Sequence, residues 1–148
     1  MSTIEISNAL WAACRIVPSQ NVGTPIAPSS FTAPDFPANY PAYGVASVNH
    51  TGNGTFLIEF EQPTADVELL CQATLHNVAG SNGGLAADAL VAEFSIPGAP
   101  QASINGGTQP AEYFRQVAFT NAATNGLTDP TLADVLFLHL PFSGQYLT

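Results

Sequence analysis

The chain has 148 residues, which suits one domain with a core of its own, and it carries eleven acidic side chains against two arginines and no lysine. The formal net charge of −9 repels phosphate backbones and anionic lipids, so we exclude DNA, RNA and membrane surfaces as direct partners. Charged residues make up 9% of the chain, against about a quarter in an ordinary soluble domain, which indicates that other subunits bury much of the surface.

The start of the chain indicates where the protein is made, and the spacing of its two cysteines indicates whether they form a disulfide. Met1 is followed by neither a basic stretch nor an apolar one, so we expect no secretory signal and synthesis in a cytoplasm. Cys14 and Cys71 lie far apart and match no disulfide framework, so both are predicted to be small buried hydrophobic residues.

Residues 1–42 are predicted to form an N-terminal arm, separate from a domain at residues 43–148. Residues 4–16 suit either a short helix or, through residues 3–6, an edge strand, and the pattern does not decide between them. Prolines then recur along residues 18–41 and prevent regular strand pairing, which indicates an extended segment.

Apolar side chains recur along this arm. They are typical of anchors that dock on the surface of a partner, and they are Ile26, Phe31, Phe36, Tyr40 and Tyr43. The alternative is that the arm lies as a strap across the core of its own domain.

Residues 43–49 and 55–61 are predicted to pair as an antiparallel hairpin. The connection between them, residues 50–54, is rich in glycine and asparagine, as tight hairpin turns are. One face of the second strand is predicted to lie on the core and comprises Phe56, Ile58 and Phe60. The other face carries Glu59 and Glu61, which we interpret as a solvated pair.

Four further strands are predicted at residues 67–76, 89–96, 114–121 and 135–140. The positions predicted to face the core are Val67, Leu69, Cys71, Ala73, Leu75, Leu90, Ala92, Phe94, Ile96, Val117 and Phe119. The last strand is apolar on both faces apart from His139, so we expect it at the centre of its sheet or at a subunit contact. The subunit interface is predicted at Leu136, Leu138 and Leu140.

These strands define the fold class. Glycine and proline separate them, and no long helical pattern occurs. The sequence therefore predicts an all-β protein, an antiparallel β-sandwich or jelly roll with an extended Pro-rich N-terminal arm.

No set of residues predicts catalysis, a metal site or a bound cofactor, so we expect a protein that is not an enzyme. His50, His76 and His139 are far apart and lack metal-binding spacing. Ser47 lacks the glycine-flanked turn of a hydrolase nucleophile. The glycine-rich residues 80–84 lack the lysine and the following helix of a phosphate-binding loop.

Several short motifs together resemble the trimeric β-sandwich modules of tailed bacteriophages. They lie within residues 43–142 and are Tyr43-Gly44-Val45-Ala46-Ser47-Val48, Thr51-Gly52-Asn53-Gly54-Thr55-Phe56, Phe60-Glu61-Gln62-Pro63, Val117-Ala118-Phe119-Thr120-Asn121 and Asp129-Pro130. Such modules occur as small head-decoration or cement proteins and at the ends of tail fibres.

The resemblance implies a compact homotrimer at the surface of a virion. It does not extend to residues 1–42, and no long shaft precedes the module, which favours a stand-alone piece over a tail-fibre role. We therefore expect a capsid decoration protein that binds the major capsid protein through its arm and stabilises the head. The alternative is a tail-fibre tip, or a receptor- or carbohydrate-binding module.

Overall fold

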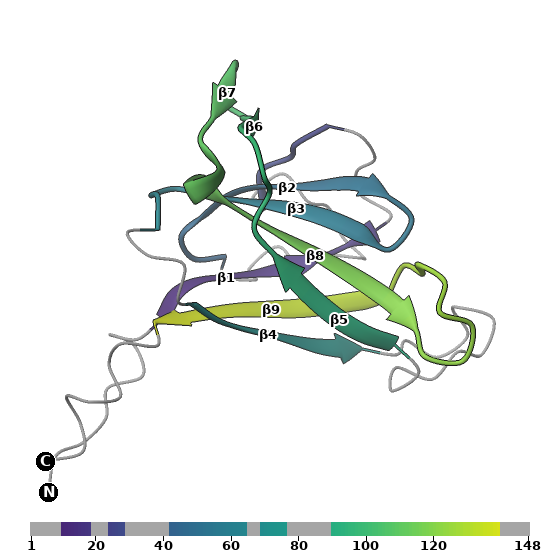
Figure 1. Cartoon of the computed structure of the whole chain (residues 1–148). Helices are drawn as coiled ribbons and strands as arrows, with labels where there is room; N and C mark the ends of the chain where they lie inside the picture. The colour runs from purple at the N-terminus through teal and green to yellow at the C-terminus, as the bar shows by residue number, and fades with distance from the viewer. Residues whose placement is uncertain (1–9, 19–23, 29–41, 65–68, 77–89, 140–148) are drawn as a thin grey trace, which may run out of the picture.

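The protein is an all-β antiparallel sandwich, shown here as a computed structural model (Figure 1). The structure describes residues 10–18, 24–28, 42–64, 69–76 and 90–139. Two sheets enclose the core, and a short two-stranded ribbon extends from one end of the molecule. The predicted fold class, an antiparallel sandwich, is confirmed.

The first sheet has three strands in the order β1-β9-β4, and the second has four strands in the order β2-β3-β8-β5. The strands of the first sheet are β1 (Leu10–Ile16), β9 (Leu132–His139) and β4 (Leu69–His76). Those of the second are β2 (Val45–Gly52), β3 (Thr55–Phe60), β8 (Phe114–Asn121) and β5 (Leu90–Ser95). The described residues also include the two strands of the ribbon and a 3-10 helix, namely β6 (Gln101–Ala102), β7 (Thr108–Gln109) and η5 (Ala111–Tyr113).

Aromatic rings from both sheets form the centre of the core. Phe137 of β9 meets Phe60 of β3 edge to face, with 4.9 Å between ring centroids, and meets Phe94 of β5 at 5.9 Å. Phe60 and Phe137 are both fully buried. Truncating a buried aromatic ring to alanine lowers the free energy of unfolding by about 3–5 kcal/mol. These ring contacts therefore contribute strongly to the packing of one sheet on the other.

The predicted strands agree with the structure where it describes them. β2 and β3 form the predicted hairpin, and the three side chains predicted to face the core are buried, namely Phe56, Ile58 and Phe60. In β4, Leu69 is buried and Leu70 is exposed, as the alternation predicted, and β9 is the central strand of its sheet. The prediction for Ile96 is wrong: this side chain is 41% exposed, because β5 ends at Ser95 and the alternation stops there.

Part of the predicted arm belongs to the sandwich. Residues 10–16 form β1, which pairs with β9 along the edge of the first sheet. Ala12, Cys14 and Ile16 are fully buried, while Ala13 and Arg15 between them are partly exposed. This period of two shows that the helix alternative is wrong for residues 10–16. The other alternative, an edge strand through residues 3–6, lies outside the described residues.

The Pro-rich segment also packs on the second sheet where the structure describes it. Ile26 exchanges two main-chain hydrogen bonds with Val48 of β2, at 3.0 and 2.9 Å, and packs against the core. The sandwich therefore includes residues 10–18 and 24–28, which precede the boundary predicted at residue 42. The other predicted anchors of the arm, Phe31, Phe36 and Tyr40, lie outside the described residues.

Candidate functional site

The outward-facing side of the first sheet carries a row of leucines. Strand register aligns Leu10 of β1 with Leu138 of β9, and aligns Leu138 in turn with Leu70 of β4. The neighbouring row across the same strands is Ala13, Leu136 and Gln72. Directly paired residues in antiparallel strands project to the same side of a sheet, so these six side chains form one surface, which we term the leucine face.

The leucine face is exposed to solvent. Leu70 is 45% exposed and Leu136 is 37% exposed, whereas Val135 and Phe137, which point to the other side of β9, are buried. Two of the three residues predicted for a subunit interface, Leu136 and Leu138, lie on this face. The third, Leu140, lies outside the described residues.

An ion pair whose two charges cancel borders the leucine face. Arg15 Nε donates to Asp134 Oδ1 at 2.8 Å, and Arg15 Nη2 donates to Asp134 Oδ2 at 3.2 Å. The two side chains face each other across β1 and β9, next to Ala13 and Leu136. The guanidinium therefore neutralises the carboxylate through a bidentate contact. In a chain of net charge −9, the described part of this sheet side is neutral, with the row of leucines next to the polar side chains of Gln72 and Thr74.

The second sheet buries a carboxylate on its outward-facing side. The predicted solvated pair of Glu59 and Glu61 is wrong for Glu59, whose side chain is 1% exposed. Ser47 Oγ donates to Glu59 Oε1 at 3.1 Å, and Ser103 Oγ donates to Oε2 at 2.6 Å. The main-chain N–H of Ile104 donates to Oε1 at 3.0 Å. Residues between β6 and β7 therefore fold over β3 and bury Glu59, a tertiary contact that strand alternation could not predict.

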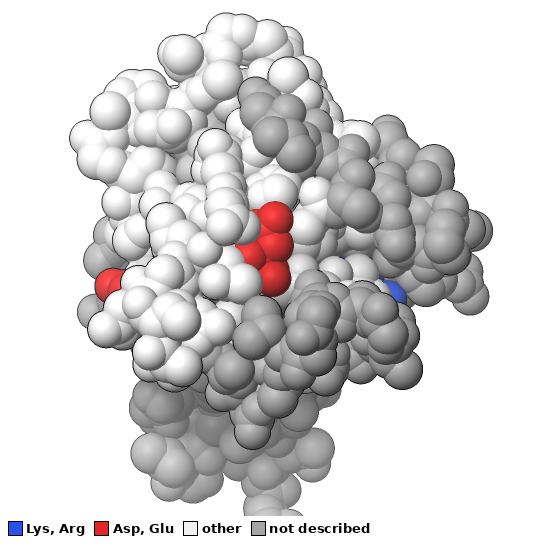
Figure 2. Space-filling view, turned by 90° about the vertical axis from the view of Figure 1, so that its right-hand side faces the viewer, with Lys and Arg blue, Asp and Glu red and all other residues white. Residues whose placement is uncertain are grey.

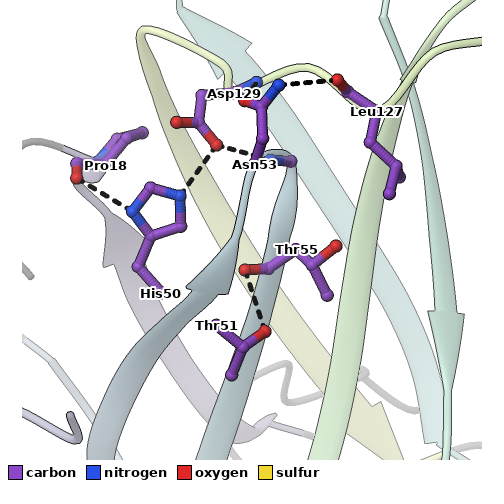
Figure 3. A network of polar contacts seen from close by, with 8 residues as sticks. Pro18, His50, Thr51, Asn53, Thr55, Leu127 and Asp129 are labelled. Atoms are coloured by element: carbon purple, nitrogen blue, oxygen red, sulfur yellow. Dashed lines mark hydrogen bonds and ion pairs between the residues drawn. The ribbon is translucent and has the colours of Figure 1, made fainter. Parts of the chain in front are cut away.

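A histidine links three separate parts of the chain (Figure 3). His50 of β2 places Nδ1 3.1 Å from the carbonyl oxygen of Pro18 and Nε2 2.9 Å from Asp129 Oδ1. Its ring stacks on Phe56 with 4.5 Å between centroids. Asp129 Oδ1 also accepts a hydrogen bond from the main-chain N–H of Gly54.

The position of His50 favours a structural role. A catalytic histidine presents one ring nitrogen to a nucleophile or a substrate. Both nitrogens of His50 instead face oxygen acceptors of this chain, and the ring is buried. The contacts therefore hold the end of β1, the β2–β3 turn and the β8–β9 connection together.

A buried arginine was missed by the sequence analysis. Arg115 of β8 is 3% exposed, and its Nη1 donates to the carbonyl oxygen of Phe114 at 2.9 Å. Its guanidinium carbon lies 5.9 Å from the centre of the Phe60 ring, a cation–π contact. The alternation of β8 contained the signal, because Arg115 is two residues before Val117 on the strand face that forms the core.

Both cysteines are free thiols in protected positions. Cys14 is buried, as predicted, and this burial raises the pKa of its thiol to about 12, with a smaller contribution from the negative charge of Asp134. Cys71 is only partly buried, so the prediction of a buried side chain is wrong for this residue. Burial raises its pKa against the opposing effect of the positive charge of Arg115. Neither thiol therefore has the lowered pKa of a reactive cysteine.

Within the described ranges, no group of three or more His, Cys, Asp or Glu side chains could hold a metal ion. In the same ranges, no helix is long and apolar enough to cross a membrane.

Comparisons with known protein families, with curated proteins and with solved structures found no match to this chain. The resemblance to bacteriophage modules therefore rests on the short sequence motifs. The leucine face is the candidate functional site, because it is the surface whose composition indicates contact with another protein.

Proposed function

We propose that the protein is a structural component of a viral particle, and that copies of it associate through the leucine face. The observation that carries this proposal is the exposure of Leu70 and Leu136 on a sheet side whose charges, Arg15 and Asp134, neutralise each other. Two copies of a chain with net charge −9 repel each other. That repulsion is weakest where a neutral face meets its own copy.

The leucines supply the attraction for this association. Burying a leucine side chain fully gives about 1.5–3 kcal/mol, while association costs roughly 4–15 kcal/mol in lost freedom of motion. Leu10, Leu70, Leu136 and Leu138 on each copy are partly or largely exposed in the single chain. Because these leucines are already partly buried, each gives only part of that gain, and the sum over two copies reaches the lower part of the cost of association. A homotrimer is the arrangement that the bacteriophage resemblance implies.

The low charge of the surface also supports a role inside an assembly. Figure 2 shows one side of the molecule on which most of the described surface is neither acidic nor basic. Across the whole chain, 9% of residues are charged. A free monomer carries more charge to remain soluble, so contacts with other subunits are the better explanation.

The more specific proposal is a capsid decoration protein that binds the major capsid protein on the outside of the head. Of the predicted anchors, Tyr43 is 55% exposed and is available to a partner, whereas Ile26 packs on its own domain. The jelly-roll form of the sandwich is part of the same proposal, since capsid proteins commonly use it.

The copy number of the protein in purified particles of the virus that encodes it tests this placement. Quantitative mass spectrometry against the major capsid protein measures it directly. A copy number comparable with that of the capsid protein supports a decoration role. A few copies per particle would favour the alternative, a tail-fibre tip or receptor-binding module, and complete absence from particles would refute the viral placement.

A further inference from the structure

His50 has an oxygen atom opposite each of its two ring nitrogens (Figure 3). Nδ1 lies 3.1 Å from the carbonyl oxygen of Pro18, and Nε2 lies 2.9 Å from Asp129 Oδ1. A carbonyl oxygen and a carboxylate oxygen are both acceptors, so each contact needs a proton on the ring nitrogen. A neutral imidazole carries one such proton, and an imidazolium carries two. Both contacts are therefore hydrogen bonds at the same time only when the ring is charged.

Among the described residues, Asp129 is the charged group that faces the ring. It comes from the connection between β8 and β9, and its Oδ1 also accepts a hydrogen bond from the main-chain N–H of Gly54 at 2.6 Å. The neighbours from the other elements are uncharged. They are the carbonyl group of Pro18, which follows β1, and the ring of Phe56 on β3, which stacks on His50. The carboxylate of Asp129 therefore favours the charged form of the ring.

The two contacts of the ring differ in strength. A hydrogen bond to an ionised carboxylate is roughly twice as strong as one between neutral groups. When the charged ring loses one proton, Nε2 keeps the remaining proton and continues to donate to Asp129. Nδ1 then becomes an acceptor and faces the carbonyl oxygen of Pro18, which is also an acceptor. The contact with Pro18 is therefore the one that is lost.

We propose that His50 is a pH-sensitive clamp, which holds the carbonyl group of Pro18 while its ring is charged and releases it when the ring is neutral. Histidine side chains ordinarily change charge between about pH 5 and 8, so the clamp is closed at acidic pH and opens as the pH rises. Pro18 comes directly after β1 and Val17, where the Pro-rich segment begins. The charge of one ring therefore controls how the start of this segment is attached to β2.

This proposal goes beyond the proposed function, because the clamp involves no residue of the leucine face and is expected whether or not copies associate. Its test is an NMR titration of the full chain from about pH 5 to 8. Long-range proton–nitrogen spectra distinguish a doubly protonated imidazole from each neutral form. The carbon signal of the Pro18 carbonyl group reports on its hydrogen bond. The carbonyl group of Ile26 accepts from the N–H of Val48 at 2.9 Å and provides an internal control.

We expect both ring nitrogens of His50 to carry a proton at the acidic end of the titration, and Nε2 alone at the other end. The Pro18 carbonyl signal is expected to shift with the same midpoint as the ring, while that of Ile26 stays constant. His50→Gln removes the titrating ring, so the Pro18 signal should no longer depend on pH.

Two further variants test the role of the carboxylate. Asp129→Asn keeps the shape of the side chain but removes its charge, so a smaller fraction of rings should be doubly protonated at about pH 6 than in the wild type. Glu93→Gln removes an exposed charge on β5 instead and should titrate like the wild type.

Three results would overturn the proposal. The first is a His50 ring with a single proton at the acidic end of the titration in the folded protein. The second is a Pro18 carbonyl signal that does not follow the ring. The third is an equal effect of Asp129→Asn and Glu93→Gln on the ring, which would show a general response to net charge. The wild-type titration alone decides the first two, so a variant that fails to fold leaves the test intact.

Discussion

At the scale of single residues, Glu59 illustrates how a charged side chain stabilises one part of the fold. Its carboxylate connects β2, β3 and the turn between β6 and β7 through three hydrogen bonds. Glu59→Ala leaves the buried hydroxyls of Ser47 and Ser103 and the N–H of Ile104 without this acceptor. Because each buried group left unsatisfied costs about 1–3 kcal/mol, we expect the free energy of unfolding to fall by roughly 3 kcal/mol.

Urea unfolding followed by circular dichroism measures this loss. Glu93→Ala is the matched control, since Glu93 is an exposed strand residue and such substitutions usually change stability by less than about 0.5 kcal/mol. Equal stability of Glu59→Ala and the wild type would show that the three hydrogen bonds contribute no net stability.

The burial of Cys14 leads to a second prediction, which concerns the free energy of unfolding at alkaline pH. Its pKa is raised from 9.0 in the unfolded chain to about 12 in the fold, chiefly by burial. The folded protein thus prefers the protonated thiol, and this contribution is complete below about pH 9 and is lost as the pH rises towards 12. We expect this thiol to lower the free energy of unfolding by about 1.4 kcal/mol at pH 10.

Comparison of the wild type with Cys14→Ala isolates that effect. The variant loses stability at neutral pH because a buried side chain is shortened. Its further loss between neutral pH and about pH 10 should be smaller than that of the wild type. An equally steep alkaline loss in both proteins would contradict the assignment to Cys14.

At the scale of elements, the β2–β3 turn packs closely against the connection between β8 and β9. Gly54 has a φ of +73°, and a Cβ added there would lie 2.6 Å from the main-chain nitrogen of Thr128 and 2.8 Å from the carbonyl oxygen of Phe119. Both the backbone conformation and the space therefore require glycine. Gly54→Ala is expected to lower the free energy of unfolding by about 2–4 kcal/mol.

Gly98→Ala is the control for this turn, because a Cβ at Gly98 would meet no atom within 4 Å. Its melting temperature should stay close to that of the wild type, while that of Gly54→Ala falls clearly. If both variants melt at the wild-type temperature, the close packing at Gly54 is not required.

The strands also show how much of the fold and of the candidate site could be predicted from the sequence. Alternation identified the strands because half-buried strands repeat every two residues, as in Phe56, Ile58 and Phe60. It did not predict the cover over Glu59, because the position of the ribbon depends on contacts between residues far apart in the chain. The leucine face was predicted in part: Leu136 and Leu138 were selected from β9, while Leu10 and Leu70 join them only through the sheet register.

At the scale of the whole molecule, the two sheets present different surfaces. The first sheet offers the leucine face, which is bordered by the ion pair of Arg15 and Asp134. On the second sheet, the residues between β6 and β7 cover Glu59, while Val91 of the edge strand β5 is exposed. The row of exposed leucines on the first sheet is the surface through which we propose that copies of the chain associate.

The mass of the protein in solution, determined by sedimentation velocity over a range of concentrations, tests association through the leucine face. We expect the wild-type chain to sediment as a homotrimer and Leu138→Asp to sediment as a folded monomer. Val91→Asp places the same charge at an exposed residue of β5, which belongs to the other sheet, and should leave the trimer intact. A wild-type chain that stays monomeric at every concentration, or a Leu138→Asp variant that remains trimeric, would contradict association through the leucine face.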